Sequence, residues 1–579
     1  MQNKRIMCGN VNAELLNKEI TLNGWIKKNR KLGSLIFIDL YDITGIVQIV
    51  VQQDNPCFKE VSSIPKESVI QVKGIVRKRS NVNKELKTGE FEIDLKSVKV
   101  YSIAKTPPFL IEENTDGLEE LRLKYRYLDL RRPNIQQYIL NRSKIINICR
   151  NYFLKNSFAE IETPILSKQT PEGARDYLVP TRTQKFFALP QSPQIYKQLL
   201  MVSGFDRYFQ FPRCFRDEDL RIDRQPEFTQ LDVEMSFVEA IDVQTMIENL
   251  FVDLFKNFLN IDLKVPFERM DYDVAMELYG CDKPDLRFDN QIINLTKYFE
   301  NTNFKIFKNC YDNKNRIGAV FIEDELSKNS IKILEKLAND NKAKGLAYLH
   351  IDNFEMTSGS IFNVIEKEII NKIATENNFK KGTLLLVADT KDVVLKALGA
   401  VRKGLLEVSD KVVIKKEYAF VWIVNWPLFE YSEEDNRYVA AHHPFTSPTQ
   451  KTIDTFDTKP EDAKGESYDI VLNGFEVGGG SIRIYDQKVQ QRMFNFLGLS
   501  EQEIQEKFGF LINAFAYGVP PHGGIALGIE RLLMLMLKTN SIRDVIAFPK
   551  NSSGVDLLFN TPSVVSDKSL QELKIKVEK

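Results

Sequence analysis

The feature that most constrains the fold is the dipeptide Asn473-Gly474, which lies between two apolar runs and is a strong signal for a two-residue β-hairpin. Counting back from this turn pairs Val471 with Glu476. Asp469 then shares a face with Val471 and becomes a diagonal neighbour of Glu476, at roughly 7–8 Å. The turn therefore predicts antiparallel strands with two carboxylates on one face, which can share a Mg²⁺ ion because that ion prefers oxygen ligands and substrate phosphates.

The second strand of this hairpin contains Gly478-Gly479-Gly480, a stretch of bare backbone that a ligand can approach closely. An unbroken ladder would pair Ile470 with Val477. Arg483 follows Glu476 at an odd spacing, so it reaches the carboxylate face only if the glycine run contains a bulge. The sequence leaves the existence of that bulge open.

A second antiparallel hairpin is predicted over residues 208–237. Three phenylalanines mark its first strand, and the return strand covers residues 227–235. Because side chains alternate along a strand, polar residues of both strands fall on one face. That face carries Arg216, Glu218, Gln230, Asp232 and Glu234. It suits a phosphate ester beside an ammonium group, and a solvent-exposed face with cross-strand ion pairs is the alternative.

Residues 1–105 contain five short β-rich runs separated by turn signals, which favours a small barrel of the OB type. This segment holds 18 Lys/Arg and 11 Asp/Glu, a net charge of +7. Basic residues at 27–31 lie beside a run that carries Phe37. Cations next to an aromatic side chain are typical of single-stranded nucleic-acid binding. The alternative is a solvated strand edge with Phe37 in the barrel core.

Three shorter motifs add candidate site residues. Ser192-Pro193 predicts the start of a helix on which Gln194 and Lys197 share a face. Gly524–Arg531 predicts a strand packed closely on a following helix, and it matches neither the Rossmann nor the Walker pattern. The pair His442-His443 has no Cys or third His nearby, so a hydrogen-bond donor to a substrate carboxylate is favoured over zinc ligation.

Composition excludes several classes of protein. The 579 residues include 79 Lys+Arg, 79 Asp+Glu, four His and six Cys, which excludes a polybasic protein and an extensive metal-cluster protein. The cysteines form no C-x-x-C pair, and no apolar run approaches the roughly 18–20 residues of a membrane helix. The first residues lead into no apolar signal segment. We expect a soluble, cytoplasmic, multidomain protein with no membrane partner.

The domain organisation is predicted from changes in pattern. A Pro-containing hinge follows the barrel, and a mixed α/β region begins with a long amphipathic helix over residues 131–155. A later region without the motifs above is expected to be an inserted α+β domain. The predicted segments are the barrel (1–105), the hinge (106–118), the first part of the main domain (119–284), the insert (285–412), and the second part with a C-terminal extension (413–579).

Taken in order, these motifs resemble those of class II aminoacyl-tRNA synthetases. Phe158–Leu166 resembles motif 1, Phe215–Glu218 with its loop and return strand resembles motif 2, and Gly524–Arg531 resembles motif 3. The blocks Gln191–Met201, Phe215–Gln230, Ala441–Pro448 and Leu472–Arg483 are similar to those of bacterial aspartyl-tRNA synthetases. The resemblance covers essentially the whole chain. It implies an antiparallel catalytic sheet and a bacterial-type (GAD-like) insert.

The resemblance also implies roles for individual residues. Arg216 and Arg531 would be catalytic and would clamp the α- and γ-phosphates of ATP. The other ATP-binding positions would be Asp217, Glu218, Gln225, Glu476, Gly528, Ile529 and Glu530. Aspartate would be bound by Glu172 on a mobile loop and by Gln194, Lys197, Arg216, Asp232, His442 and Arg483. Asp469 and Glu476 would bind Mg²⁺, and Arg30, Phe37, Gln48 and Glu92 would contact the anticodon.

The implied enzyme is an AMP-forming aspartate–tRNA ligase of protein biosynthesis. It would join L-aspartate to tRNA-Asp through an aspartyl-adenylate, with transfer to the 3′-terminal ribose hydroxyl. Mg²⁺ would enter with ATP, and no zinc or organic cofactor is expected. Motif 1 implies a homodimer. Asparaginyl- or lysyl-tRNA synthetases and a non-catalytic RNA-binding relative are the alternatives. Leu32 resembles the enzymes strict for tRNA-Asp, but charging of tRNA-Asn stays open, as do the role of the insert and the source organism.

Overall fold

The computed structural model describes residues 5–169, 173–433 and 436–578. The chain divides into two compact units, residues 1–133 and 134–579, and each is described by itself. The domain boundaries at residues 105, 118, 284 and 412 stay predictions. Among the described residues, no helix is long and apolar enough to cross a membrane.

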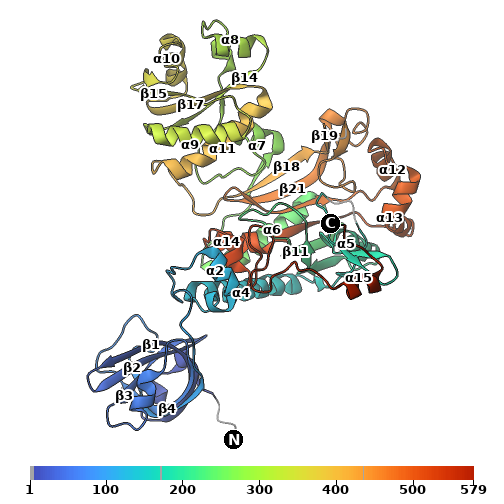
Figure 1. Cartoon of the computed structure of the whole chain (residues 1–579). Helices are drawn as coiled ribbons and strands as arrows, with labels where there is room; N and C mark the ends of the chain where they lie inside the picture. Colours follow the sequence, from blue (N-terminus) through green and yellow to red (C-terminus); the bar gives the residue numbers. More distant parts are fainter. Residues whose placement is uncertain (1–4, 170–172, 434–435, 579) are drawn as a thin grey trace. The chain divides into compact units, whose positions relative to one another are not determined.

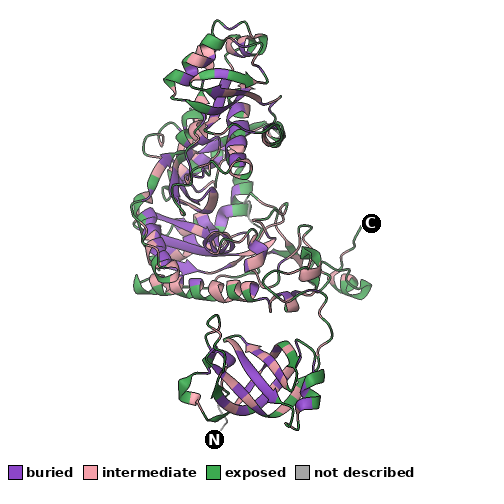
Figure 2. Cartoon of the chain, turned by 90° about the vertical axis from the view of Figure 1, so that its left-hand side faces the viewer, coloured by how far each residue is buried: buried purple, intermediate pink, exposed green. Residues whose placement is uncertain are grey.

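The first unit contains a closed five-stranded barrel with strand order β1-β2-β3-β5-β4 (Figure 1). All five predicted strands are present. Isoleucine, leucine and valine side chains alternate along them and fill the barrel interior. Figure 2 shows the buried residues along these strands. The strands are β1 (Glu19–Leu32), β2 (Leu35–Asp42), β3 (Gly45–Gln52), β4 (Val69–Lys78) and β5 (Phe91–Ser102), with helices α1 (Phe58–Ser63), α2 (Glu119–Lys124) and α3 (Arg126–Asp129).

The second unit is built on a nine-stranded, mostly antiparallel sheet. The strand order is β12-β18-β21-β22-β23-β11-β9-β6, and β10 pairs with β11 beside this path. The strands are β6 (Ala159–Glu160), β9 (Arg207–Gln210), β10 (Arg213–Phe215), β11 (Glu227–Ser236), β12 (Glu268–Asp271), β18 (Phe420–Pro427), β21 (Lys464–Leu472), β22 (Phe475–Ile482) and β23 (His522–Gly528). The strand predicted through Phe209, Phe211 and Phe215 was wrong in one respect, because it breaks at Pro212 into β9 and β10.

One face of this sheet packs on helices and forms the main core. Leu231, Val233 and Met235 of β11 point into this core, while the residues between them face the other way. Helices α4 (Pro133–Lys155), α6 (Ala240–Leu259) and α14 (Ile529–Met536) supply the apolar side chains opposite. The capping box between Glu239 and Asp242 starts α6. The opposite face of the sheet is therefore left for polar side chains.

The remaining helices and short strands of the second unit lie outside its nine-stranded sheet. The predicted helix at Ser192-Pro193 begins at Gln194, and the Ser192 hydroxyl accepts a hydrogen bond from the Gln194 backbone N–H at 3.3 Å. These elements are β7 (Leu178–Pro180) with β8 (Phe186–Ala188), β19 (Phe429–Ser432) with β20 (Arg437–Ala440), and helices α5 (Gln194–Val202), α7 (Tyr272–Tyr279), α12 (Gln487–Phe496), α13 (Glu501–Phe515) and α15 (Asp567–Leu573).

The region between α7 and β18 folds around its own five-stranded sheet, with order β13-β14-β17-β15-β16. Helices α9 and α11 cover one face, and α8 and α10 cover the other (Figure 1). Apolar residues on both faces explain why β17 reads as a continuous apolar run. The elements are β13 (Ile293–Asn294), β14 (Arg316–Ile322), β15 (Ala347–Asp352), β16 (Glu355–Gly359), β17 (Lys381–Asp389), α8 (Lys305–Asp312), α9 (Lys328–Asp340), α10 (Lys367–Glu376) and α11 (Lys391–Val408).

Candidate active site

A cavity of about 620 Å³ lies over the polar face of the nine-stranded sheet. We call it the polar cavity, and it is lined by strands β11, β21, β22 and β23, helix α5 and several loops. The predicted site residues that it brings together are Gln194, Lys197, Arg216, Glu218, Gln225, Asp232, His442, Asp469, Glu476, Arg483, Gly528, Glu530 and Arg531. The fold thus gathers residues that are up to 337 positions apart, from 194 to 531.

Two predicted residues of this unit do not line the polar cavity. Ile529 is fully buried in the main core beneath the sheet. Asp217 lies on the loop after β10, where its carboxylate is 3.6 Å from Arg175. Glu172 lies outside the described residues.

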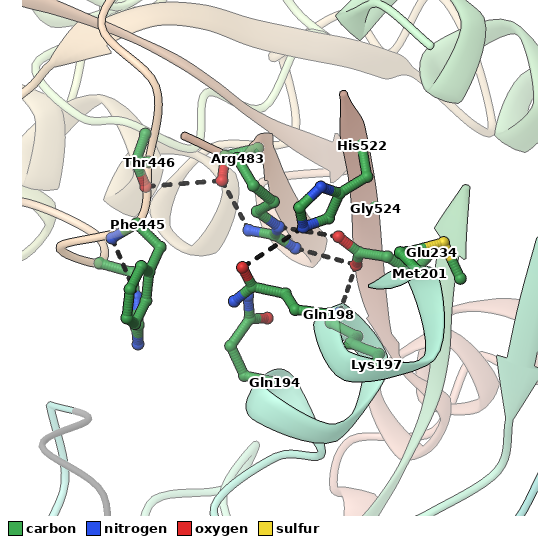
Figure 3. A network of polar contacts seen from close by, with 12 residues as sticks. Gln194, Lys197, Gln198, Met201, Glu234, Phe445, Thr446, Arg483, His522 and Gly524 are labelled. Atoms are coloured by element: carbon green, nitrogen blue, oxygen red, sulfur yellow. Dashed lines mark hydrogen bonds and ion pairs between the residues drawn. The ribbon is translucent and has the colours of Figure 1, made fainter. Parts of the chain in front are cut away.

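Two cations and two carboxylates form a buried network at the cavity wall. Figure 3 shows three of its members, Lys197, Arg483 and Glu234. Lys197 Nζ lies 3.1 Å from Asp232 Oδ1 and 3.4 Å from Glu234 Oε2. Arg483 donates from Nε and Nη2 to the two oxygens of Glu234, at 3.0 and 3.2 Å. Its Nη1 donates to Ser481 Oγ at 2.6 Å. All four charged side chains are at most 5% exposed, so each charge depends on the others for compensation.

The network sets the protonation of its carboxylates. Burial alone raises the pKa of Glu234, but Arg483 and Lys197 outweigh it and hold the pKa below its usual range. Burial raises the pKa of Asp232 despite Lys197. Asp232 Oδ2 has no hydrogen-bond partner among the described residues, although it is buried and its residue lines the cavity. This oxygen can accept a hydrogen bond from a ligand.

A β-bulge explains why Arg483 and Glu476 share the cavity. Val471 pairs with Glu476 as predicted, but Ile470 pairs with Gly478. The predicted pairing of Ile470 with Val477 was wrong, because Val477 is the extra residue of the bulge. The bulge therefore precedes the glycine run. Its extra residue shifts the alternation of side chains after it, so Glu476 and Arg483 lie on one face although the spacing between them is odd.

The two predicted Mg²⁺ ligands lie on that same face. Asp469 is 7% exposed and has Gly479 as its cross-strand partner, where an added Cβ would sit 2.5 Å from Asp469 Oδ1. Burial and the charges of Glu476 and Asp282 raise the pKa of Asp469 well above its usual range. Closely spaced carboxylate oxygens fit a hard divalent cation. Among the described residues no group of three metal-ligating side chains could hold an ion alone, so such a cation needs ligands from a bound molecule.

Two arginines from different elements also face the polar cavity. Arg216 lies 5.2 Å from the centre of the Phe228 ring, and its buried Nε has no partner in the described part of the chain. Arg531 donates to the Glu476 carbonyl oxygen at 2.6 Å, and its Nη2 lies 3.2 Å from Asp223 Oδ2. Separate guanidinium groups in one cavity are suited to binding the oxygens of a polyphosphate.

Several predicted ATP-binding side chains are engaged with protein groups. Glu218 pairs with Arg224 at 2.8 Å. The Gln225 amide exchanges two hydrogen bonds with the Lys550 backbone, at 3.0 and 2.8 Å. Glu530 accepts from the Thr229 backbone N–H at 3.0 Å and from Arg142 at 2.8 Å. These contacts fix the loops around the cavity.

The paired histidines differ in their surroundings. His442 lines the polar cavity and contacts the Trp426 ring edge-on, with ring centres 4.7 Å apart. His443 also lines the cavity, but it is stacked on Phe445, whose backbone N–H donates to His443 Nδ1 at 3.3 Å. Burial, followed by the charges of Arg483 and Lys197, lowers the pKa of His443 to about 3. His443 is therefore neutral at physiological pH.

Sequence reasoning missed four residues that shape this site. Glu234 was placed on the polar face but given no role, although it holds both cations. His522 and Gln198 lie beside it, with His522 Nε2 3.4 Å from Gln198 Oε1 (Figure 3). Asp282 enters the cavity from the loop after α7. Strand alternation could have identified Glu234, whereas no local signal marks Asp282.

In the barrel, the four predicted anticodon positions lie on adjacent strands. Arg30 is paired with Phe37, and Gln48 is paired with Glu92. Phe37 is half-buried between the fully buried Ile36 and Ile38, so it faces outward and the interpretation of Phe37 as a core residue was wrong. Gln48 Nε2 donates to Glu92 Oε2 at 2.9 Å, and Arg30 pairs with Asp39 at 3.0 Å. Leu32, at the end of β1, is 64% exposed.

Comparisons with known proteins agree with this architecture. The model of the tRNA synthetases class II (D, K and N) matches residues 118–552, and that of the OB-fold nucleic acid binding domain matches residues 20–101. The aspartate–tRNA ligase of Malacoplasma penetrans (strain HF-2) is 67% identical over 577 residues, covering 100% of both chains. That of Ureaplasma parvum serovar 3 is 52% identical and covers 99% of this chain and 100% of its own.

Among solved structures, asparaginyl-tRNA synthetase from Pyrococcus horikoshii complexed with asparaginyl-adenylate has a TM-score of 0.60. It is 18% identical and covers 94% of this chain and 98% of its own, so it shows the shared fold alone. The predicted fold class, an OB-type barrel with a class II synthetase catalytic sheet, is confirmed. Because the first family model covers most of the chain and both relatives match it over nearly its whole length, the chain belongs to the class II tRNA synthetases of the D, K and N group.

Proposed function

We propose that this chain is an aspartate–tRNA ligase that activates L-aspartate with ATP in the polar cavity and transfers it to tRNA-Asp. The observation that carries the proposal is the convergence of Lys197 and Arg483 in a cavity that also contains Arg216 and Arg531. The first pair suits a carboxylate, and the second suits the phosphates of a nucleotide. The names of the full-length relatives support the same assignment.

Aspartate binds through both of its ends. Lys197 and Arg483 contact the side-chain carboxylate, and Asp232 with Gln194 binds the ammonium group. The protein network carries two positive and two negative charges, so a ligand with one ammonium and one side-chain carboxylate keeps it balanced. An asparagine amide would leave a cation without its counter-charge. His442 donates to the substrate, and Glu172 is assigned to aspartate binding.

ATP binds across the arginines. Arg216 contacts the α-phosphate and Arg531 the γ-phosphate, while Glu218 and Gln225 position the adenosine. Asp469 and Glu476 fit the Mg²⁺ that enters with ATP, because their oxygens are hard ligands that lie together on one face. That ion supplies charge neutralisation for the phosphates. Gly528 and Glu530 complete the nucleotide site by shaping its walls. Asp217 and Ile529 adjoin these wall residues in the chain without lining the cavity.

The reaction needs no protein nucleophile. An oxygen of the α-carboxylate of aspartate attacks the α-phosphorus of ATP in line. The bond from that phosphorus to the oxygen that bridges it to the β-phosphorus breaks, and pyrophosphate leaves. The terminal ribose hydroxyl of tRNA then attacks the aspartyl carbonyl carbon, and the bond from that carbon to the phosphate oxygen breaks. AMP leaves, and one of its phosphate oxygens takes up the hydroxyl proton. Arg216 stabilises the negative charge that develops on the phosphoryl oxygens, and Arg531 holds the leaving pyrophosphate.

The barrel supplies the tRNA contact. Arg30, Phe37, Gln48 and Glu92 lie on neighbouring strands where they can bind the anticodon, with Phe37 as a stacking platform. We assign the chain to the cytoplasm and to a homodimer, and residues 285–412 to an inserted domain. Leu32 favours an enzyme for tRNA-Asp alone.

ATP–pyrophosphate exchange with each amino acid tests the function. We expect exchange with aspartate alone. Exchange with asparagine or lysine would refute the substrate assignment, and exchange with no amino acid by the folded protein would favour a non-catalytic RNA-binding role. Charging of purified tRNA-Asp and tRNA-Asn then tests the tRNA assignment.

A further inference from the structure

The loop that joins α7 to β13, residues 280–292, connects the inserted domain to the polar cavity. We call it the connecting loop. Helix α7 packs on both β18 of the catalytic sheet and α11 of the inserted domain (Figure 1). Immediately after α7, Asp282 reaches the cavity wall. The loop then continues into the inserted domain.

A single arginine of the inserted domain holds the connecting loop. Arg402 lies on α11 and is 3% exposed, and its hydrogen bonds within the described part of the chain all go to backbone carbonyl groups of this loop. Its guanidinium also lies 3.9 Å from the centre of the Phe288 ring. The carbonyl acceptors and their distances from Arg402 are Asp285 (2.9 Å), Phe288 (2.7 Å), Asp289 (2.8 and 3.1 Å) and Asn290 (3.1 Å).

A glycine contact brings the helix and the loop together. The end of α7 at Gly280 has φ +67°, and Gly399 of α11 lies against it. A Cβ at Gly399 would meet the carbonyl oxygens of Gly280 and Tyr279 at 2.8 Å. Because backbone packs on backbone, any shift of α11 must move the connecting loop.

Asp282 is the residue through which that movement reaches the polar cavity. It is half-buried, and it adds a third negative charge beside Asp469 and Glu476. The Asp469 backbone is paired in the sheet, but its side chain has no hydrogen bond or ion pair with the other described residues. Lys283 compensates only partly, because its Nζ lies 3.7 Å from Asp282 Oδ1. The carboxylates of Asp282, Asp469 and Glu476 thus carry a surplus of negative charge. The most buried of them, that of Asp469, has no partner among the described residues.

We propose that the inserted domain positions the connecting loop through Arg402, and that the loop thereby holds Asp282 where its carboxylate strengthens binding of the divalent cation that enters with ATP. This rests on the proposed function. Asp282 acts beside Asp469 and Glu476 as an outer partner of the cation, and Arg402 is a positioning residue. The inserted domain would then tune the first step of the reaction, besides any contact with RNA.

Binding of Mn²⁺, used as a spectroscopic probe for Mg²⁺, tests the proposal apart from activity. The full-length chain is titrated with Mn²⁺ and a non-hydrolysable ATP analogue, and free Mn²⁺ is read by electron paramagnetic resonance. We expect Asp282→Asn to weaken Mn²⁺ binding roughly ten- to a hundredfold, as loss of outer partners does in other metal sites. Arg402→Lys keeps the positive charge but loses the guanidinium group with its several N–H donors. It should also weaken Mn²⁺ binding, but by less than Asp282→Asn does.

Matched surface variants serve as controls. Asp273→Asn removes an exposed acid of α7, and Lys396→Ala removes an exposed cation of α11. Neither should alter Mn²⁺ binding. Circular dichroism checks that each variant is folded. Should Arg402→Lys fail that check, Gly399→Ala, which displaces the same contact, replaces it.

The outcomes separate this proposal from the proposed function. Unchanged Mn²⁺ affinity in Asp282→Asn would overturn the proposal, and a loss in Asp282→Asn with none in the folded α11 variant would overturn the part assigned to the inserted domain. In either case wild-type exchange with aspartate would leave the proposed function standing. As a second readout, excess Mg²⁺ should restore exchange in Asp282→Asn.

Discussion

Replacing Arg483 by leucine should separate aspartate recognition from ATP binding. Of the five N–H groups of a guanidinium, three are used by Glu234 and Ser481, which leaves two for the substrate carboxylate. A charge-assisted hydrogen bond contributes about 1.5–3 kcal/mol. Loss of two such bonds should therefore lower kcat/KM for aspartate by at least about a hundredfold, since 1.36 kcal/mol corresponds to a tenfold change.

The same variant should also be less stable. Breaking a buried ion pair costs about 3–5 kcal/mol of unfolding free energy, because the remaining charge stays buried. Lys197 remains 3.4 Å from Glu234, so we expect a loss near the lower value, about 3 kcal/mol. Urea unfolding measures this loss, and ATP–pyrophosphate exchange at varied aspartate and varied ATP measures recognition.

A matched control distinguishes recognition from instability. Arg269→Leu removes a cation 3.1 Å from the buried Glu248, away from the polar cavity. It should lower stability without changing the KM for aspartate. If Arg483→Leu weakens ATP and aspartate binding equally, or if Arg269→Leu raises the KM for aspartate to the same extent, the role given to Arg483 is refuted.

Three further predictions follow from single residues. Phe37→Ala should weaken tRNA binding without changing aspartate-dependent exchange, and unchanged affinity in a fluorescence titration would remove its stacking role. The pKa of His443, about 3 in the folded chain against an ordinary 6.5, means that only the unfolded chain gains this proton as the pH falls below 6.5. The unfolding free energy, measured with urea, should therefore fall between pH 7 and pH 5 in the wild type. In His443→Gln this fall should be smaller by up to about 2 kcal/mol, and an equal fall in both proteins would contradict the prediction. Gly479→Ala should reduce exchange roughly tenfold by displacing Asp469, whereas Gly345→Ala, with open space around it, should have full activity.

Local pattern was sufficient for the barrel and for the two hairpins. Alternation placed Leu231 and Val233 on the core side and Asp232 and Glu234 on the other, because strand geometry has a period of two. The pattern could not show that Asp232 and Glu234 are fully buried, since a polar strand face is usually solvated. Their burial depends on Lys197 and Arg483, which arrive from distant segments.

Register was the point at which the sequence alone was insufficient. The turn at Asn473-Gly474 specified the first pairs, but the bulge at Val477 depends on how β22 fits between β21 and β23. An extra residue in one strand leaves no mark in the apolar pattern when the neighbouring residues are glycines. Only the assembled sheet therefore placed Arg483 and Glu476 on the same face.

The sequence by itself determined the kinds of element, the family resemblance and the identity of most charged residues of the cavity, because these depend on local spacing and on motifs. Tertiary structure alone decided that Lys197 and Arg483 share Glu234, that Gln225 and Glu530 are held by protein groups, and that Asp282 reaches the polar cavity. Such contacts join segments tens to hundreds of residues apart. Their geometry follows from the packing of whole helices and strands, which a short stretch of sequence does not specify.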